Sequence, residues 1–236
     1  MPRLQIGAHA ALMTAAALSA FFGLTMGASA GCNSKAAAEV DWSDCRKRNL
    51  IMSGSTLTNA NIEGADLTST DLRDSNLDGA NLTKADLSRT YLSGSSLVGA
   101  DFSKAVAYRA LLDKTDLTDA QFEKSEMLRA DFTDAIFRNT DFAKAELGRA
   151  LFVGVKMDDV LFSYSNLARA DFRGAKTLGS VDFNNSFLYR TSFEGVDLSK
   201  ATGLVQSQLD ISCGNSETLL PEGLVQPADW PCQTDD

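Results

Sequence analysis

The chain has 236 residues, of which 44% are hydrophobic and 22% are charged, and its formal net charge is −9 at pH 7. This length fits one domain, and the acidic balance argues against binding to bulk nucleic acid or to an anionic membrane surface. The one histidine is His9, so the chain after it has neither the base of a serine–histidine or cysteine–histidine pair nor an imidazole metal ligand.

The first 30 residues are expected to form a secretory signal peptide. Arg3 is the one charge before Lys35, residues 10–27 are apolar, and residues 28–30 (Ala-Ser-Ala) have the small side chains of a cleavage site. Cleavage after Ala30 would release a periplasmic or secreted protein with no transmembrane span. It would also lower the formal net charge from −9 to −10, because residues 1–30 carry one basic side chain and no acid.

Two alternatives exist for this N-terminal segment. A transmembrane anchor fits less well, because the apolar run is short and rich in Ala and Gly. A lipoprotein signal would make Cys32 the acylated residue and would anchor the protein in the envelope. Small residues precede Cys32, but Ser29 stands where such signals usually carry Leu.

Four cysteines form two pairs that are local in the sequence, Cys32 with Cys45 and Cys213 with Cys232. In an oxidising compartment such an even count predicts two disulfides, one fastening each end of the region between them. The alternatives are free thiols, or a plain core role for Cys45. The spacings match no zinc pattern, and we expect neither a metal nor another cofactor.

Residues 40–201 carry a five-residue repeat. An apolar residue recurs at every fifth position from Met52 to Phe172, and the position two residues earlier is almost always small. A period of five fits neither a helix nor a strand, so it indicates a solenoid. A unit such as Ala80-Asn81-Leu82-Thr83-Lys84 would point one small and one large side chain inward.

These units resemble the A(D/N)LXX motif of the pentapeptide-repeat family, from Val40 to about Ala201. The resemblance to exported bacterial members implies an all-β fold, a right-handed quadrilateral parallel β-helix of about 7–8 coils with four pentapeptides per coil. Residues 31–39 would be a linker, and residues 202–236 a C-terminal capping helix and tail.

Both ends of the solenoid need a cover. At the first coil we expect Trp42 to form a lid and Lys47, which occupies a large apolar position, to turn out to solvent. Near the other end, residues 204–211 are expected to be a short helix. Four apolar residues would then cover the last coil: Leu219, Leu220, Leu224 and Trp230.

One extra residue within residues 176–180 is expected to be a bulge that preserves the register. Allowing for it, positions one coil apart form two internal columns that change from aliphatic to aromatic. We expect the Phe rings to stack along the axis. The aromatic parts are Phe102, Phe122, Phe142, Phe162 and Phe183 in one column, and Phe132, Phe152, Phe172 and Phe193 in the other.

Two columns of basic residues are expected on the outside. One column is Lys84, Lys104, Lys124 and Lys144, and the other is Arg89, Arg109, Arg129, Arg149, Arg169 and Arg190. Stacked like charges repel, and Asp86, Glu126 and Glu146 each follow a lysine by two residues. One interpretation is a solvated corner with salt bridges; the other is a docking stripe for a polyanion or an acidic partner.

Apolar residues at outward positions suggest a second surface. Leu111, Leu128, Leu151 and Val153 could form a contact patch for a partner or for a homodimer.

The sequence favours a non-enzymatic protein. Its acids fall at the polar position of the repeat or in turns, no phosphate loop or nucleophile elbow occurs, and a filled rod offers no cleft. We expect an exported scaffold or protein-interaction module that binds a protein or a polyanionic envelope component, and no nucleic acid.

The main functional alternative comes from the family resemblance. Some family members protect topoisomerases as acidic mimics of DNA, a role that would require a chain that is not exported. The basic columns and the lack of an inserted loop in the first 25 units also depart from those members. An ice-binding Thr ladder and Gly-rich calcium-binding nonapeptides are both poorly matched.

Overall fold

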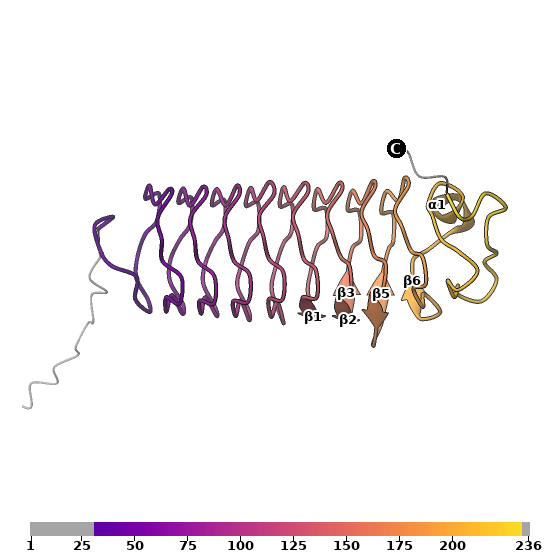
Figure 1. The fold of residues 1–236 in the computed structure, drawn as a ribbon, viewed down its shortest axis with the longest axis horizontal. Coiled ribbons are helices and arrows are strands. Elements are labelled where there is room, and N and C mark those ends of the chain that lie inside the picture. Colours follow the sequence, from indigo (N-terminus) through magenta and orange to yellow (C-terminus); the bar gives the residue numbers. More distant parts are fainter. Residues whose placement is uncertain (1–30, 233–236) are drawn as a thin grey trace, which may run out of the picture.

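The computed structural model describes residues 31–232, which wind around one long axis to form a rod (Figure 1). The expected signal peptide, residues 1–30, lies outside the described residues. Between residues 31 and 232, no helix combines the length and the apolar character needed to cross a bilayer.

Successive coils pair through parallel backbone bridges between residues 20 positions apart. Asp41 pairs with Asn61, Asn61 with Asn81, and Asn81 with Asp101. Each bridge uses the two kinds of bond of a parallel ladder: the Leu82 N–H donates to the Asp101 carbonyl at 2.7 Å, and the Asp101 N–H donates to the Ala80 carbonyl at 3.0 Å. This arrangement confirms the predicted all-β parallel solenoid, with four five-residue units in each coil.

Most of these pairings are single bridges, and longer strands occur only towards the C-terminal half of the described rod. β1, β2 and β4 form one three-stranded parallel sheet, and β3, β5 and β6 form another. The strands are β1 (Ile136–Arg138), β2 (Lys156–Asp158), β3 (Val160–Leu161), β4 (Lys176–Thr177), β5 (Val181–Asp182) and β6 (Ala201–Thr202).

From Glu39 to Gly174 every unit turns a corner through a residue with positive φ, which explains the polar positions of the repeat. Gly and Asn tolerate this conformation well, as at Gly54 (φ 70°) and Asn59 (φ 53°). The outward Asp or Asn supports the turn by accepting a hydrogen bond from the backbone two residues later. The Asp101 carboxylate, for example, lies 2.8 Å from the Ser103 nitrogen.

The core is filled by columns of inward side chains. All large-position residues from Leu57 to Phe172 are fully buried. In the first aromatic column the ring centroids of Phe102, Phe122, Phe142, Phe162 and Phe183 are 4.7, 4.6, 5.2 and 5.5 Å apart in sequence order. In the second column the spacings from Phe132 to Phe193 are 5.1, 4.6 and 5.4 Å. Both predicted stacks are confirmed.

The one-residue insertion lies in residues 178–180. Before it, Met157 pairs with Thr177 at a separation of 20, and after it Val160 pairs with Val181 at a separation of 21. The Asp159 carboxylate holds the extra loop by accepting hydrogen bonds from the Ser180 N–H at 3.0 Å and the Ser180 hydroxyl at 2.9 Å. The insertion therefore extends a corner and leaves the core in register, as predicted.

The N-terminal end is closed differently from the expectation. The predicted disulfide joins Cys32 to Cys45 and fastens the segment around Ser34 to the first coil. Lys47 does not turn out to solvent: it is only 7% exposed, its Nζ donates to the Ser34 carbonyl at 3.0 Å, and it lies 4.0 Å from the Trp42 ring centroid. This burial lowers the pKa of Lys47. Trp42 is fully buried, so it is part of the covered core and not the outermost lid.

At the other end, the second predicted disulfide joins Cys213 to Cys232. The helix α1 (Gln206–Leu209) is shorter than expected, and its Leu209 is fully buried. The Gln208 side chain is also buried at the C-terminal end of the core, where its amide donates hydrogen bonds to the Phe183 carbonyl at 3.0 Å and the Ser186 carbonyl at 2.8 Å.

The expectation for Leu219 was wrong, whereas Leu220 packs against the core. Leu219 pairs with Asp197 at an outward ladder position, which leaves its side chain 54% exposed. Trp230 is half-buried, and its ring occupies the space that a Cβ on Gly214 would need, with the closest ring carbon 2.2 Å from that point.

Candidate interaction surface

Two neighbouring corners of the coil carry the basic columns. We call Lys84, Lys104, Lys124 and Lys144 the Lys corner, and Arg89, Arg109, Arg129, Arg149, Arg169 and Arg190 the Arg corner. All ten residues are the positive-φ residues of their turns, with φ between 54° and 61°. The structure thus brings each predicted column together on one edge of the rod, and the two edges flank a single face.

Three of the four lysines of the Lys corner form ion pairs with two glutamates. Lys84 Nζ lies 2.7 Å from a carboxylate oxygen of Glu63, and Lys124 and Lys144 each lie 3.1 Å from the same oxygen of Glu123. The acids expected beside the lysines, Asp86, Glu126 and Glu146, make no ion pair with them in the described part of the chain. The actual partners lie on the turns, up to one coil earlier.

These ion pairs lower the pKa values of both glutamates. The hydrogen bond from Lys84, together with its charge, lowers the pKa of Glu63 below its ordinary value and raises the pKa of Lys84 in return. Hydrogen bonds from Lys144 and then Lys124 lower the pKa of Glu123 in the same way. Because all these groups are exposed, the pairs set the local charge more than they stabilise the fold.

Four arginines of the Arg corner lack this neutralisation. Within residues 31–232, Arg89, Arg109, Arg129 and Arg149 have no carboxylate within ion-pairing distance. The Arg109 guanidinium instead lies 5.2 Å from the ring centroid of its neighbour Tyr108. Elsewhere the rod does pair its arginines, since Arg73 and Arg173 each lie 2.6 Å from an aspartate.

A notch interrupts the Arg corner. The residue that precedes each arginine varies in size along the rod, in the order Ser88, Tyr108, Leu128, Gly148, Ala168 and Tyr189. At the smallest of these the surface is hollowed to a volume of about 380 Å³, lined by Tyr108, Leu128, Arg129, Gly148, Arg149 and Ala168.

The notch exists because Gly148 has no side chain. A Cβ built there would lie 3.7 Å from the Ala168 carbonyl oxygen and 3.9 Å from Leu128 Cδ2, which are ordinary contact distances. A larger residue would therefore fit and fill the hollow. The size order of the turn residues was visible in the sequence, but its meaning required knowing that they form one line.

The predicted apolar patch is only partly continuous. Leu128 and Leu151 are 42% and 39% exposed. Leu111 and Leu151 belong to one ladder, but Asp131 pairs with both and separates them. Of the four predicted residues, only Leu128 lines the notch, while Leu111 and Val153 are half-buried.

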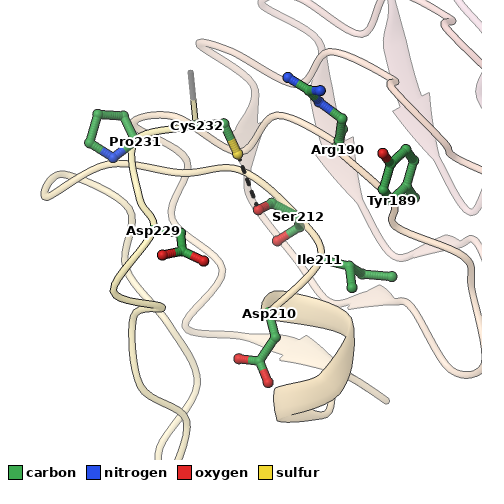
Figure 2. Close-up of a pocket in the computed structure, with 8 residues that line it drawn as sticks. All are labelled: Tyr189, Arg190, Asp210, Ile211, Ser212, Asp229, Pro231 and Cys232. Atoms are coloured by element: carbon green, nitrogen blue, oxygen red, sulfur yellow. Dashed lines mark hydrogen bonds between the residues drawn. The ribbon is translucent and has the colours of Figure 1, made fainter. Parts of the chain in front are cut away.

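A second hollow of about 620 Å³ lies where the C-terminal tail meets the end of the Arg corner (Figure 2). Figure 2 shows Tyr189 and Arg190 on one side and Asp229, Pro231 and Cys232 on the other, with Asp210 beside α1. Cys232 Sγ lies 3.4 Å from the Ser212 carbonyl oxygen. Groups of both charge signs line this hollow, so it carries no net preference for an anion.

Residues 31–232 contain no cluster of three or more His, Cys, Asp or Glu side chains placed to hold a metal ion.

Comparison with known proteins gives matches at the level of both sequence family and fold. The family model described as pentapeptide repeats (8 copies) matches residues 48–74, 75–113 and 85–122, and the model described as pentapeptide repeat region matches residues 125–202. No match was found among curated protein sequences.

Solved structures resemble the rod. Two trypsin-treated variants of QnrB1, a plasmid-mediated fluoroquinolone resistance protein, are each 17% identical and align with TM-scores of 0.53 and 0.51. Each alignment covers 77% of this chain, and 84% and 86% of the respective QnrB1 chains. HetL, involved in heterocyst differentiation regulation in the cyanobacterium Nostoc, is 26% identical over 76% of this chain and 86% of its own, with a TM-score of 0.49. At these identities the QnrB1 likeness concerns the fold alone.

Proposed function

The chain belongs to the pentapeptide-repeat family, and from this premise we propose that it is an exported, non-enzymatic scaffold or interaction protein that binds an acidic protein partner through its Arg corner. The observation that carries the proposal is the contrast in pairing between two basic edges. Two glutamates pair with three lysines, whereas Arg89, Arg109, Arg129 and Arg149 have no carboxylate partner within residues 31–232.

Physical chemistry favours this edge as the binding surface. Arginines on successive coils lie about 4.8 Å apart, so their charges repel one another unless an external anion is bound. The guanidinium group is weakly hydrated and matches a carboxylate with two parallel hydrogen bonds. An acidic partner would therefore relieve repulsion and gain directional contacts together.

Export is supported by the cysteines. Both pairs form disulfides, which persist in oxidising compartments such as the bacterial periplasm. The Cys32 sulfur is bonded to Cys45, and a cysteine alkylated by lipid has no thiol for such a bond, which argues against the lipoprotein alternative. A cytoplasmic DNA mimic is also disfavoured by these bonds and by the exposed arginines.

The binding surface is tested by a matched pair of triple variants. In one, Arg109, Arg129 and Arg149 are replaced by Asn, and in the other Lys104, Lys124 and Lys144 are replaced by Asn. Both remove three charges at positive-φ positions, and Asn tolerates that conformation. Each protein is used as bait for an envelope extract, with quantitative mass spectrometry of what is captured.

We expect the arginine variant to lose its partner by at least about tenfold, a loss of roughly 1.4 kcal/mol in binding free energy, while the lysine variant retains it. Equal capture by all three proteins would refute the role of the Arg corner. Mass spectrometry of the mature protein with and without reduction tests export separately, through cleavage after Ala30, an unmodified Cys32 and two disulfides.

A further inference from the structure

We infer that the notch at Gly148 is an anchor site, which accepts one apolar side chain of a partner's acidic segment while Arg129 and Arg149 bind the carboxylates beside that side chain. The inference rests on the proposed function and adds to it the chemistry of the ligand. It makes the position of the notch, and not only the charge of the Arg corner, decisive for binding.

The shape of the notch supports an apolar side chain. Its floor is the bare backbone at Gly148, with the Leu128 side chain on one side and Ala168 on the other. The Leu128 side chain is 42% exposed, although the large side chains beneath it are fully buried. A partner side chain seated between Leu128 and Ala168 would remove apolar surface of both molecules from water.

The charges beside the notch select what flanks that side chain. Arg129 and Arg149 both line it, one coil apart, and neither has a carboxylate partner in the part of the chain that the structure describes. Arg109 lies one coil before Arg129, beside the ring of Tyr108. Carboxylates on both sides of a central apolar residue would each reach one arginine.

The lining argues against a polyanion without apolar groups as the ligand of the notch. Among the six lining residues, the Tyr108 hydroxyl is the one neutral side-chain group that can donate a hydrogen bond. A phosphate chain would use the arginines and leave the apolar floor exposed. An acidic peptide with an apolar residue uses both features.

The test measures binding of synthetic peptides to the mature chain by fluorescence anisotropy. The first peptide has a central Leu flanked on each side by four acidic residues, and the second has Ser in place of Leu. A third peptide keeps the Leu and replaces the acids by their amides. We expect the Leu peptide to bind about tenfold more tightly than the Ser peptide, and the amide peptide not to bind measurably.

Gly148→Leu isolates the notch from the charge. The backbone of Gly148 lies outside the positive-φ region, and the surface has room for a side chain at this position, so the variant should fold. It is expected to abolish the preference for Leu over Ser while retaining binding of the Ser peptide. Ala143→Leu, at the same turn position on the Lys corner, is the control and should keep the preference. If Gly148→Leu unfolds, Gly148→Tyr replaces it, because Tyr occupies the equivalent turn positions 108 and 189.

The outcomes separate the two proposals. If the Leu and Ser peptides bind alike, or if the filled notch keeps the preference, the anchor is refuted while capture through the Arg corner can still stand. Inorganic polyphosphate that binds wild type and Gly148→Leu as tightly as the Leu peptide binds wild type would assign the arginines to a polyanion and overturn the anchor. Failure of the Arg-corner capture experiment refutes the proposed function itself.

Discussion

The Lys corner and the Arg corner share one backbone conformation and differ in the acids within reach of their basic residues. In both, the basic residue has positive φ and follows an outward turn residue. Of the turn residues that precede the four lysines, Glu123 is the one acid, and it pairs with Lys124 and Lys144; Glu63, at the same position one coil before Lys84, pairs with Lys84. On the Arg corner the turn residue has a hydroxyl, aromatic, aliphatic or absent side chain. Acids at this turn position therefore pair with three lysines of one basic edge, whereas Arg89, Arg109, Arg129 and Arg149 have no carboxylate partner within residues 31–232.

The largest expected effect concerns the core on which both corners rest. Phe152→Ala should lower the free energy of unfolding by about 3–5 kcal/mol, because Phe152 is fully buried and stacks on Phe132 and Phe172. Chemical denaturation with a tryptophan or circular dichroism signal measures this. The control is Phe187→Ala, a ring that is 51% exposed, for which the loss should stay below about 1 kcal/mol. Similar losses from the two would contradict the assignment of stability to the stacks.

A second change should make the Lys corner resemble the Arg corner. Glu63→Gln with Glu123→Gln removes the partners of Lys84, Lys124 and Lys144. Affinity for the acidic peptide with a central Ser should rise about threefold at low salt, measured by anisotropy. Glu126→Gln with Glu146→Gln removes the same charge from the intervening face and should raise affinity less. An equal rise would mean that net charge, and not pairing, distinguishes the corners.

A pH titration should resolve the paired acids. In the folded protein the lysines lower the pKa of Glu123 below its ordinary value of 4.5. The pair therefore stabilises the fold fully above about pH 4.5, and this contribution is lost as the pH falls through the lowered pKa. Replacing Lys124 and Lys144 by Asn should raise the Glu123 pKa towards 4.5 in an NMR titration, whereas Lys104→Asn should leave it unchanged. No change in the double variant would refute the pairing.

The smallest effect tests the shared backbone. Lys104→Gly and Arg89→Gly each relieve an L-residue from positive φ, at 60° and 57°. Each should raise the free energy of unfolding by less than about 1 kcal/mol and by similar amounts, because the relief is partly offset by the greater freedom of Gly in the unfolded chain. Thermal unfolding measures the shift. Ala143→Gly, on the same kind of turn but outside positive φ, should lower stability, and a gain there would count against this explanation.

Sequence periodicity predicted the core almost completely, for a physical reason. Each coil has 20 residues, so a position in the sequence fixes both the height and the side of the rod. The Phe stacks, the basic columns and the insertion at residues 178–180 followed from that frame alone. The two disulfides were also predictable, because each pair lies close in the sequence at one end of the repeat.

The ends and the surface pairing were less predictable. The repeat frame describes what lies above and below each residue, and this information stops at the first and last coils. Lys47 was expected in solvent because the sequence did not reveal that the segment around Ser34 covers it. The role of Glu123 was missed because its reach to Lys144 spans 21 residues and depends on side-chain direction. The notch at Gly148 became visible only when six turn residues were placed in one line.

The even spacing of the coils also sets the repeat distance that the side chains of a partner must match. Ladder positions repeat about every 4.8 Å along the axis, whereas one side of an extended strand repeats about every 6.7 Å and one face of a helix about every 5.4 Å. If a strand lies along the Arg corner, its side chains fall out of register with the arginines after one residue pair. A helix drifts by about 0.6 Å per turn and stays within reach of three or four successive arginines. The axial repeat of the partner's side chains therefore determines how many arginines it can contact at once.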